Sequence, residues 1–498
     1  MPRTAKKRSK ADDVSTTYQI LQFLARVAVW GYFRNVKVIT RAPISKEGPL
    51  LVAANHMNMV LDPAVLIATF PHDRPCHFWA LKRFFRIPLA GKILRAAGVL
   101  PVDTKTRSNA KLFEHTFACL ENGGVVALFP EGTSYTAPQH LPFKNGISWA
   151  AFEYLTHQFE KDNNTQSSIS IIPVGITYTT KNKWRSDVVV EYGEPIKVTS
   201  KDLKDFQVDP KPAVKSLTER IAEGVEKGTV NSPDWDTYHA AAEARYLLFG
   251  DKQNLRLEDY VHVSQSLIEI LHPSRIEGKT DPKWEERAYL KTRLLTFSKT
   301  LRMLRLTAKD IRMYENREIT MKRAIFRLAS TWTALAIQLP LFLPGIIINW
   351  PIYLLGRLAE RFEKHTESVS QDKLVLSVVV AIPLYSTIFY QLWKMMEFTL
   401  FGFVIALITI PILAWYHMAL VDKRYDMAKD VVASWRICVA LVASISGFNA
   451  TPARELEDAV QLQRWCRVNT KSLLLELSKY GDTHAQYLVL IGKSFIDE

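Results

Sequence analysis

A histidine and an aspartate six positions apart are the first residues in the chain whose types and spacing suggest chemistry. His56 and Asp62 follow the apolar run Leu50–Ala54, which has the length and composition of a buried strand. On one helix this spacing would turn the two side chains roughly 240° apart, so we expect a loop after the strand. Pro63 suits the first position of a helix and Asp62 suits its N-cap, with the helix continuing to Thr69.

A carboxylate bonded to one imidazole nitrogen fixes the tautomer and leaves the other nitrogen as a general base near neutral pH. His56 folded back onto Asp62 would make such a base. An isolated pair of this kind is more often a loop histidine beside an ordinary helix cap. The interpretation therefore depends on the rest of the chain.

The segment Phe129-Pro-Glu-Gly-Thr-Ser134 also follows an apolar run and is the second candidate constellation. A strand that ends here would aim one carboxylate and several backbone amides into the same loop region. We expect Glu131 to hold a substrate hydroxyl and the amide of Gly132 to face a developing oxyanion. A plain turn is the alternative, because Pro and Gly mark turns widely.

Basic residues lie between and after these two loops. A phosphate monoester needs convergent Lys or Arg partners. For any single one of them a solvated surface charge is the alternative. The candidates are Lys82, Lys105, Arg107, Lys144 and Arg185.

The elements that must position these loops follow from the alternation of apolar runs. Strand-like runs at residues 50–54, 124–129, 169–174 and 188–192 alternate with helical patterns. They predict a layered α/β domain over residues 40–200, with the loops after the strands available for chemistry. We expect a helix to begin within residues 231–236, and amphipathic helices to fill a helical region over residues 201–325.

A membrane region is predicted over residues 326–421. Between Lys373 and Lys394 lie 20 uncharged residues and between Glu397 and Asp422 lie 24 more, each long enough to cross a bilayer. The linker between them is so short that residues 374–421 should form a transmembrane hairpin. The apolar segment 328–356 contains three prolines, which argue against a smooth span and favour a re-entrant or interfacial element. Buried helices of a soluble protein are the alternative.

Charge supports this organisation. The net charge of +14 favours anionic partners, which include nucleic acid, phosphorylated substrates and anionic lipid headgroups. Basic residues flank all three apolar segments, so the positive-inside rule predicts an even number of crossings and cytosolic C-terminal helices over residues 422–498. Residues 1–39 read as a basic tail and an N-terminal membrane-associated helix without a cleavage site. The four cysteines show no spacing typical of a disulfide lattice or a zinc site.

Taken in order, four stretches resemble the four blocks of the glycerolipid acyltransferase superfamily. They are the His/Asp loop, Leu81-Lys82 with Gly98-Val-Leu-Pro-Val102, Phe129-Pro-Glu-Gly132, and Ile172-Pro-Val-Gly175. Five residues between the histidine and the aspartate, with proline after the aspartate, look like the fungal-type glycerol-3-phosphate and dihydroxyacetone-phosphate sn-1 acyltransferases. The stretch 183–196 and the helix entry near Asp234 are similar to that subgroup too.

The resemblance implies transfer of a fatty acyl group from acyl-CoA to the sn-1 hydroxyl of glycerol 3-phosphate or dihydroxyacetone phosphate. His56 would take the hydroxyl proton, the alkoxide would attack the thioester, and Asp62 would orient His56. The expected partners are acyl-CoA as co-substrate, the phosphorylated acceptor and membrane lipids, with no cofactor, no metal and no nucleic acid. The expected location is the endoplasmic reticulum membrane with the catalytic domain facing the cytosol.

One departure keeps the acceptor open. Related sequences often carry a phosphate-binding Arg where this chain has Thr104, and Lys105 or Arg107 would have to replace it. A lysophosphatidate or lysophospholipid acyltransferase is therefore the first alternative function. A non-catalytic membrane scaffold is the second.

Overall fold

A computed structural model describes most of the chain as two compact units. Unit 1 comprises Met1–Val230 and Phe362–Leu374, and unit 2 comprises Asn231–Arg361 and Val375–Glu498. The described residues are 16–102, 109–162, 168–250, 255–272, 283–312, 314, 320–363, 366–445 and 451–492. The predicted basic tail therefore lies outside them.

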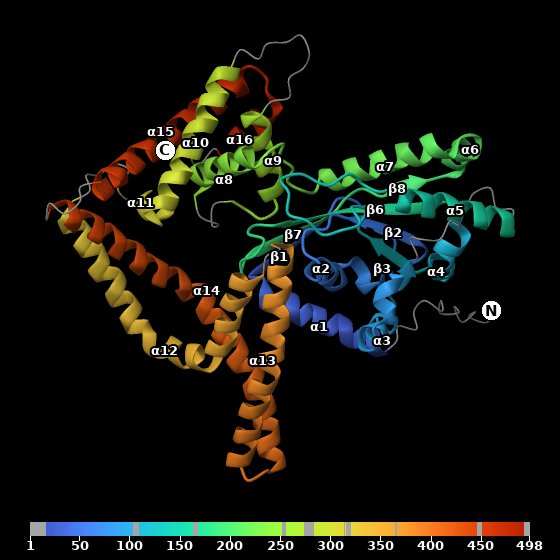
Figure 1. The fold of residues 1–498 in the computed structure, drawn as a ribbon, viewed down its shortest axis with the longest axis horizontal. Coiled ribbons are helices and arrows are strands. Elements are labelled where there is room, and N and C mark those ends of the chain that lie inside the picture. Colours follow the sequence, from blue (N-terminus) through green and yellow to red (C-terminus); the bar gives the residue numbers. More distant parts are fainter. Residues whose placement is uncertain are drawn as a thin grey trace, which may run out of the picture. The chain divides into compact units, whose positions relative to one another are not determined.

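Unit 1 is built on a mixed sheet with the strand order β1-β7-β6-β2-β5-β3-β4, and β8 pairs with β6 (Figure 1). All neighbouring strands run parallel except β6 with β7 and β6 with β8. The strands are β1 Asn35–Thr40, β2 Leu50–Ala54, β3 Cys76–Leu81, β4 Leu100–Val102, β5 Val125–Leu128, β6 Ile169–Tyr178, β7 Asp187–Tyr192 and β8 Ile196–Val198. The four apolar runs of the sequence thus form β2, β5, β6 and β7.

The central strands are apolar throughout because helices cover both faces of the sheet. Alternate residues of one strand enter two different cores: Leu50 and Val52 pack on one face, and Leu51 and Ala53 on the other. Figure 1 shows α1 and α2 on one face and α5 and α7 on the other. The helices of this unit are α1 Thr16–Tyr32, α2 Leu61–Thr69, η2 Pro71–Asp73, η3 Lys82–Arg86, α3 Pro88–Ala96, α4 Asn109–Glu121, α5 Gly146–Asp162, α6 Ser200–Val208 and α7 Pro210–Glu226.

The parallel strands bring the loops of interest to one edge. Because β2, β3, β4 and β5 all run the same way, their carboxyl ends lie at the same side of the sheet. His56 follows β2, Lys82 follows β3 and Glu131 follows β5. This is the arrangement that open α/β sheets use for ligand binding.

Unit 2 contains a helical bundle and most of the membrane region. The bundle is made of α8 Trp235–Phe249, α9 Tyr260–Leu271, α10 Trp284–Leu304, α11 Ala308–Arg312, α15 Thr451–Lys479 and α16 Thr483–Ile491. The helix entry expected within residues 231–236 is α8, whose N-cap Asp234 accepts a hydrogen bond from the amide of Thr237 at 2.6 Å.

Three helices of the described residues are long and apolar enough to cross a membrane. They are α12 Met321–Phe362, α13 Thr366–Met395 and α14 Leu400–Ile445. The turn between α13 and α14 falls where the short linker predicted a hairpin. Segment 328–356, predicted to be re-entrant or interfacial, is part of the continuous helix α12, which bends part-way along its length (Figure 1). Its prolines bend the helix without ending it.

The α/β fold class followed by helices and a helical membrane region is confirmed. The boundaries differ from those expected. Residues 201–230, expected in the helical region, form α6 and α7 and complete unit 1, because one face of the sheet needs α7 as cover. Helix α14 continues past residue 421 to Ile445, and the predicted end of the membrane region at residue 421 stays a prediction.

Candidate active site

The loop after β2 is fixed to the sheet by a buried asparagine. The Asn55 side chain donates to the carbonyl of Ile176 at 2.9 Å and accepts from the amide of Ile176 at 2.7 Å. The Asn55 side chain thereby supplies one more pair of hydrogen bonds with β6 after the end of β2. The chain can then leave the sheet at His56 without losing hydrogen bonds at a buried position.

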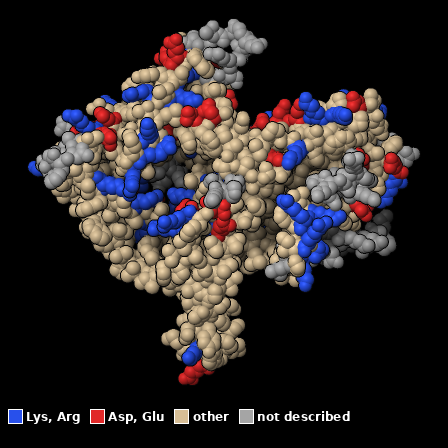
Figure 2. All heavy atoms as spheres, in the orientation of Figure 1, with Lys and Arg blue, Asp and Glu red and all other residues tan. Residues whose placement is uncertain are grey.

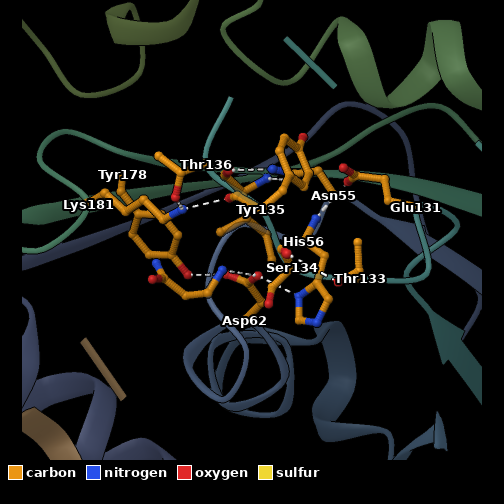
Figure 3. A network of polar contacts seen from close by, with 12 residues as sticks. Asn55, His56, Asp62, Glu131, Thr133, Ser134, Tyr135, Thr136, Tyr178 and Lys181 are labelled. Carbon is orange, nitrogen blue, oxygen red and sulfur yellow. Dashed lines mark hydrogen bonds and ion pairs between the residues drawn. The ribbon is translucent and has the colours of Figure 1, made fainter. Parts of the chain in front are cut away.

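His56 and Asp62 meet as the sequence predicts. The Nδ1 atom of His56 lies 2.8 Å from Oδ2 of Asp62, and the second ring nitrogen points away from the carboxylate (Figure 3). The Asp62 side chain is fully buried, whereas 12% of the His56 side chain is exposed. A buried carboxylate on one nitrogen and access to the other is the geometry of a general base.

Asp62 is not the helix N-cap that we expected. Val60 occupies the cap, and Asp62 lies inside the first turn of α2. Its carboxylate accepts from the amide of Asn58 at 2.8 Å and from the hydroxyl of Tyr178 on β6. Three donors therefore surround this carboxylate, and both of its oxygens are held in place.

The backbone and the ring of His56 are also held. Its amide donates to Oε1 of Glu131 at 2.8 Å, and its carbonyl accepts from the amide of Tyr135 at 3.3 Å. Its ring stacks on Phe129 with 4.0 Å between ring centroids and an interplanar angle of 12°. These contacts tie the loop after β2 to the loop after β5.

Glu131 lies differently from the expected position. Its side chain is buried, and it binds the main chain of His56 instead of projecting towards a substrate hydroxyl. Burial raises the pKa of Glu131 to about 8, with backbone hydrogen bonds from His56 and Leu141 opposing the rise. This carboxyl shapes the loop that carries the base.

Gly132 also differs from expectation. Its amide donates to the carbonyl of Phe129 at 3.0 Å, so this amide is used within the turn and does not face an oxyanion. The residue has φ +73°, and a side chain here would meet the Lys144 ammonium, whose nitrogen lies 2.3 Å from the position of a Cβ. The Lys144 side chain therefore crosses this turn.

A buried polar chain extends from Tyr135. Its hydroxyl bonds Nδ1 of His140 at 2.8 Å, and Nε2 of His140 bonds the hydroxyl of Thr229 at 2.7 Å. Burial lowers the pKa of His140 to about 4, so this imidazole is neutral at physiological pH. Lys181 donates to the carbonyl of Tyr135 at 2.7 Å and to the hydroxyl of Thr136 at 2.8 Å (Figure 3).

The loop that contains Lys181 also binds the beginning of α13. The hydroxyl of Ser370 donates to the carbonyl of Lys181 at 2.9 Å, and the ammonium of Lys373 donates to the carbonyl of Asn182 at 2.7 Å. Two hydrogen bonds thus connect the first turns of α13, a candidate membrane helix, to the loop between β6 and β7.

The basic residues predicted to bind phosphate lie in different places. Lys144 lies at the turn after β5, and Lys82 begins η3 at the same edge of the sheet. Lys105, Arg107 and the departure at Thr104 lie outside the described residues.

Arg185 is not placed to bind a substrate phosphate. It is buried, and its guanidinium donates to the carbonyls of Trp30 at 2.9 Å and Phe33 at 2.6 Å. These carbonyls end α1, where cations are favourable. Arg185 is a cap for α1.

Sequence reasoning missed Tyr178, Lys181, Phe129 and His140. A signal existed for Tyr178: a tyrosine at the end of an apolar strand must find a partner for its hydroxyl once buried. Nothing in the sequence could identify Asp62 as that partner. Within the described residues, no group of three or more His, Cys, Asp or Glu side chains could hold a metal ion.

The pair has the geometry of a general base, and within the described part of the chain no Ser or Cys side chain is hydrogen-bonded to the His56 ring. Comparison with known proteins agrees with it. Residues 35–177, which contain both loops, match the family model named Acyltransferase. The chain carries an acyltransferase domain.

The chain is also homologous to yeast enzymes. Glycerol-3-phosphate O-acyltransferase 2 of Saccharomyces cerevisiae is 27% identical over 291 residues, which are 56% of this chain and 37% of that protein. Glycerol-3-phosphate O-acyltransferase 1 of the same yeast is 25% identical over 276 residues, 54% of this chain and 34% of that protein. The matches thus span little more than a third of each relative.

The chain is also similar to a solved structure. It is the crystal structure of the 1-acyl-sn-glycerophosphate acyltransferase PlsC from Thermotoga maritima. The match has 19% identity and a TM-score of 0.29, and it covers 41% of this chain and 78% of that one.

Proposed function

We propose that this protein transfers a fatty acyl group from acyl-CoA to the sn-1 hydroxyl of glycerol 3-phosphate, with dihydroxyacetone phosphate as a second acceptor. The product would be lysophosphatidate for phospholipid and triacylglycerol synthesis. The observation that carries the proposal is the 2.8 Å contact between Nδ1 of His56 and Asp62 within an acyltransferase domain. The homology to two glycerol-3-phosphate O-acyltransferases supports the choice of acceptor.

The chemistry is direct acyl transfer. The free ring nitrogen of His56 takes the proton of the acceptor hydroxyl while the hydroxyl oxygen attacks the thioester carbonyl. The tetrahedral intermediate collapses with loss of the CoA thiolate, which takes the proton back from the imidazolium. Asp62 stabilises the imidazolium and keeps the ring in one orientation.

The oxyanion of this intermediate needs donors other than Gly132. The amides of Thr133 and Ser134 follow the turn directly, beside the loop of His56 (Figure 3). Among the described residues neither amide donates a hydrogen bond. We assign the oxyanion to these two amides and the acceptor phosphate to Lys144.

The three apolar helices support a membrane location, because each is long and apolar enough to cross a bilayer. We assign it to the endoplasmic reticulum, with the acyltransferase domain on the cytosolic side where acyl-CoA is present. Membrane lipids surround the helices and receive the product.

The test uses purified full-length protein and labelled acyl-CoA, with glycerol 3-phosphate, dihydroxyacetone phosphate or lysophosphatidate as acceptor. Replacing His56 with Ala should lower turnover by about 10³-fold, within the range of general base catalysis. The matched control is His115→Ala, which changes an exposed histidine on α4.

Retained turnover in the His56→Ala variant would contradict the proposed base. Faster turnover with lysophosphatidate than with either three-carbon phosphate would assign the protein to the alternative acceptor. No turnover by the unaltered protein with any acceptor would leave the scaffold function.

A further inference from the structure

A basic segment without any acidic residue follows β3. Residues 74–102 contain no Asp or Glu. Within them, η3 and α3 present five exposed cations, and Figure 2 shows blue side chains gathered over this part of unit 1. We call residues 81–95 the η3–α3 patch. Its cations are Lys82, Arg83, Arg86, Lys92 and Arg95.

Large apolar side chains are interleaved with these cations. Ile87 is 52% exposed and Ile93 49%, and Phe84 and Leu81 are exposed as well. The guanidinium of Arg83 lies 5.1 Å from the centroid of the Phe84 ring. The patch therefore offers charge and apolar area on the same short segment.

The patch lies at the edge of the sheet that carries the candidate base. Its first residues continue from the carboxyl end of β3, and β5 lies between β3 and β2 with all three strands parallel. The loop of His56 also exposes apolar side chains, since Met59 and Val60 are 46% and 41% exposed. Apolar exposure is thus shared by the patch and the catalytic loop.

Helix α1 extends this surface. It buries Tyr18, Val29 and Tyr32, but its outer side is an exposed apolar stripe at helical spacing. The Tyr18 ring lies 6.5 Å from the His77 ring, and Nδ1 of His77 lies 2.8 Å from the carbonyl of Gly98, two residues after α3. The stripe consists of Ile20, Phe23, Leu24, Val27 and Trp30.

Three kinds of partner fit such a surface unequally. A soluble phosphorylated ligand would use the cations but gain nothing from Phe84, Ile87 or Ile93. A neutral bilayer would use the apolar side chains alone. An anionic bilayer uses both, because each cation near its surface strengthens binding roughly fivefold and apolar side chains insert at the headgroup boundary.

Unit 1 continues along the chain directly into a candidate membrane span. Residues Phe362–Leu374 belong to this unit, and α13 continues from them as a candidate span. The bonds from Ser370 and Lys373 fix this helix beside the loop at Lys181. We propose that the η3–α3 patch docks on an anionic phospholipid surface and sets the candidate active site against it.

The proposal gives Lys82 a lipid headgroup as its partner, whereas the sequence suggested a substrate phosphate. Docking itself does not depend on the acceptor of the proposed reaction. If that reaction holds, its single-chain product would enter the bilayer at the edge of the sheet where it forms.

The experiment places a nitroxide label on full-length protein in phosphatidylcholine nanodiscs, with or without phosphatidylserine. The label is attached at Ile87→Cys, and the matched control is Val208→Cys at the end of α6, where the native side chain is 87% exposed. Protein without either substitution, treated with the same nitroxide reagent, measures how far the native cysteines are labelled. With phosphatidylserine, the label at residue 87 should be reached by oxygen several-fold more readily than by a water-soluble nickel chelate, and the label at residue 208 should not.

The charge dependence is tested in the triple variant Arg83→Gln, Arg86→Gln, Lys92→Gln. In this variant the label at residue 87 should again be accessible to the water-soluble nickel chelate. The melting temperature should stay within a few degrees of that of the protein with the native patch. A water-exposed label in both lipids would overturn the proposal, and equal protection in both lipids would overturn the anionic preference. An unchanged label together with a raised KM for acyl-CoA would make the patch a ligand site instead.

Discussion

The carboxylate of Asp62 has two hydrogen-bond donors in addition to its partner His56. The amide of Asn58 and the hydroxyl of Tyr178 bind the same carboxylate that contacts His56. Tyr178 comes from β6, so the orientation of the base depends on a strand far away in the sequence. We therefore expect this buried hydroxyl to act through Asp62 and to position His56.

Replacing Tyr178 with Phe removes the donor to Oδ1 of Asp62. A lost hydrogen bond to a charged group costs about 1.5–3 kcal/mol, so kcat should fall roughly 10- to 100-fold. The KM of the acceptor should stay unchanged, because the substrate does not contact Tyr178. Steady-state kinetics measure both values, with Tyr154→Phe on α5 as the control. A lower melting temperature with an unchanged kcat would show a purely structural role.

Glu131 gives the stability of the fold a pH dependence. The folded carboxyl keeps its proton up to about pH 8, whereas the ordinary pKa is 4.5. Between these values the folded state binds more protons than the unfolded state, so the free energy of unfolding falls as the pH rises. Glu131→Gln cannot titrate but keeps an oxygen for the His56 amide. Its melting temperature should therefore fall less between pH 5 and pH 8 than that of the unaltered protein, and equal slopes would contradict the raised pKa.

The sequence predicted the pair His56 and Asp62 because chain direction and spacing leave few arrangements after a strand. It did not predict how Glu131 and Gly132 are used. A Pro-Glu-Gly turn is compatible with a carboxyl facing either the substrate or the neighbouring loop, and only the packing of β2 beside β5 selects the second. Arg185 was misassigned for the same reason, since the carbonyls that it binds lie about 150 positions away.

At the scale of elements, Arg185 joins the loop after β6 to the end of α1. Arg185→Ala would leave the carbonyls of Trp30 and Phe33 without this donor in a buried position. The free energy of unfolding should fall by about 3 kcal/mol, while the acceptor KM of the folded protein stays the same. Denaturation in detergent and kinetics measure the two effects. Arg220→Ala, which removes an exposed ion pair with Asp202, should cost less than about 1 kcal/mol. A raised KM without loss of stability would restore the phosphate-binding role.

Two polar contacts join the three candidate membrane helices. The hydroxyl of Tyr353 on α12 bonds Nε2 of His417 on α14 at 2.7 Å, and the hydroxyl of Tyr385 on α13 donates to Asn349 on α12 at 3.1 Å. The other ring nitrogen of His417 lies 2.4 Å from the position that a Cβ on Gly345 would take. Small residues of this kind let membrane helices approach closely.

Two glycines of α12 therefore make a matched pair. Gly345→Ala places a methyl group against the His417 ring, whereas Gly356→Ala meets nothing within 4 Å. Overpacking costs about 1–3 kcal/mol, so the first variant should melt several degrees lower and the second should not. Melting in nanodiscs measures the difference. In the His417→Ala background the same Gly345→Ala change should cost little, and an equal loss in both backgrounds would contradict the contact.

Element types were predictable because runs of apolar residues fix strands and membrane helices by length alone. The prolines of residues 328–356 lie inside a continuous helix, since neighbouring helices in a membrane region tolerate bends that an isolated helix would not, and the re-entrant or interfacial assignment stays a prediction. The number of crossings therefore stays a prediction, with α12 now a third candidate span.

At the scale of the whole molecule, the two units are interleaved along the chain. Unit 1 takes its last piece, Phe362–Leu374, from the end of α12 and the residues after it, beyond the first four bundle helices α8 to α11. No boundary signal marks this piece, because its apolar residues lie next to the uncharged run that predicts the membrane hairpin. Ser370 is fully buried only through packing that the sequence cannot display.

This interleaving sets an order during synthesis. A ribosome adds about 5–20 residues per second, so many seconds pass between the completion of α7 and the emergence of residues 362–374. In that interval α12 has already left the ribosome and is available to the insertion machinery. The loop at Lys181 and Asn182 gains its contacts with Ser370 and Lys373 only afterwards, so we expect unit 1 to complete its packing after α12 has been synthesised.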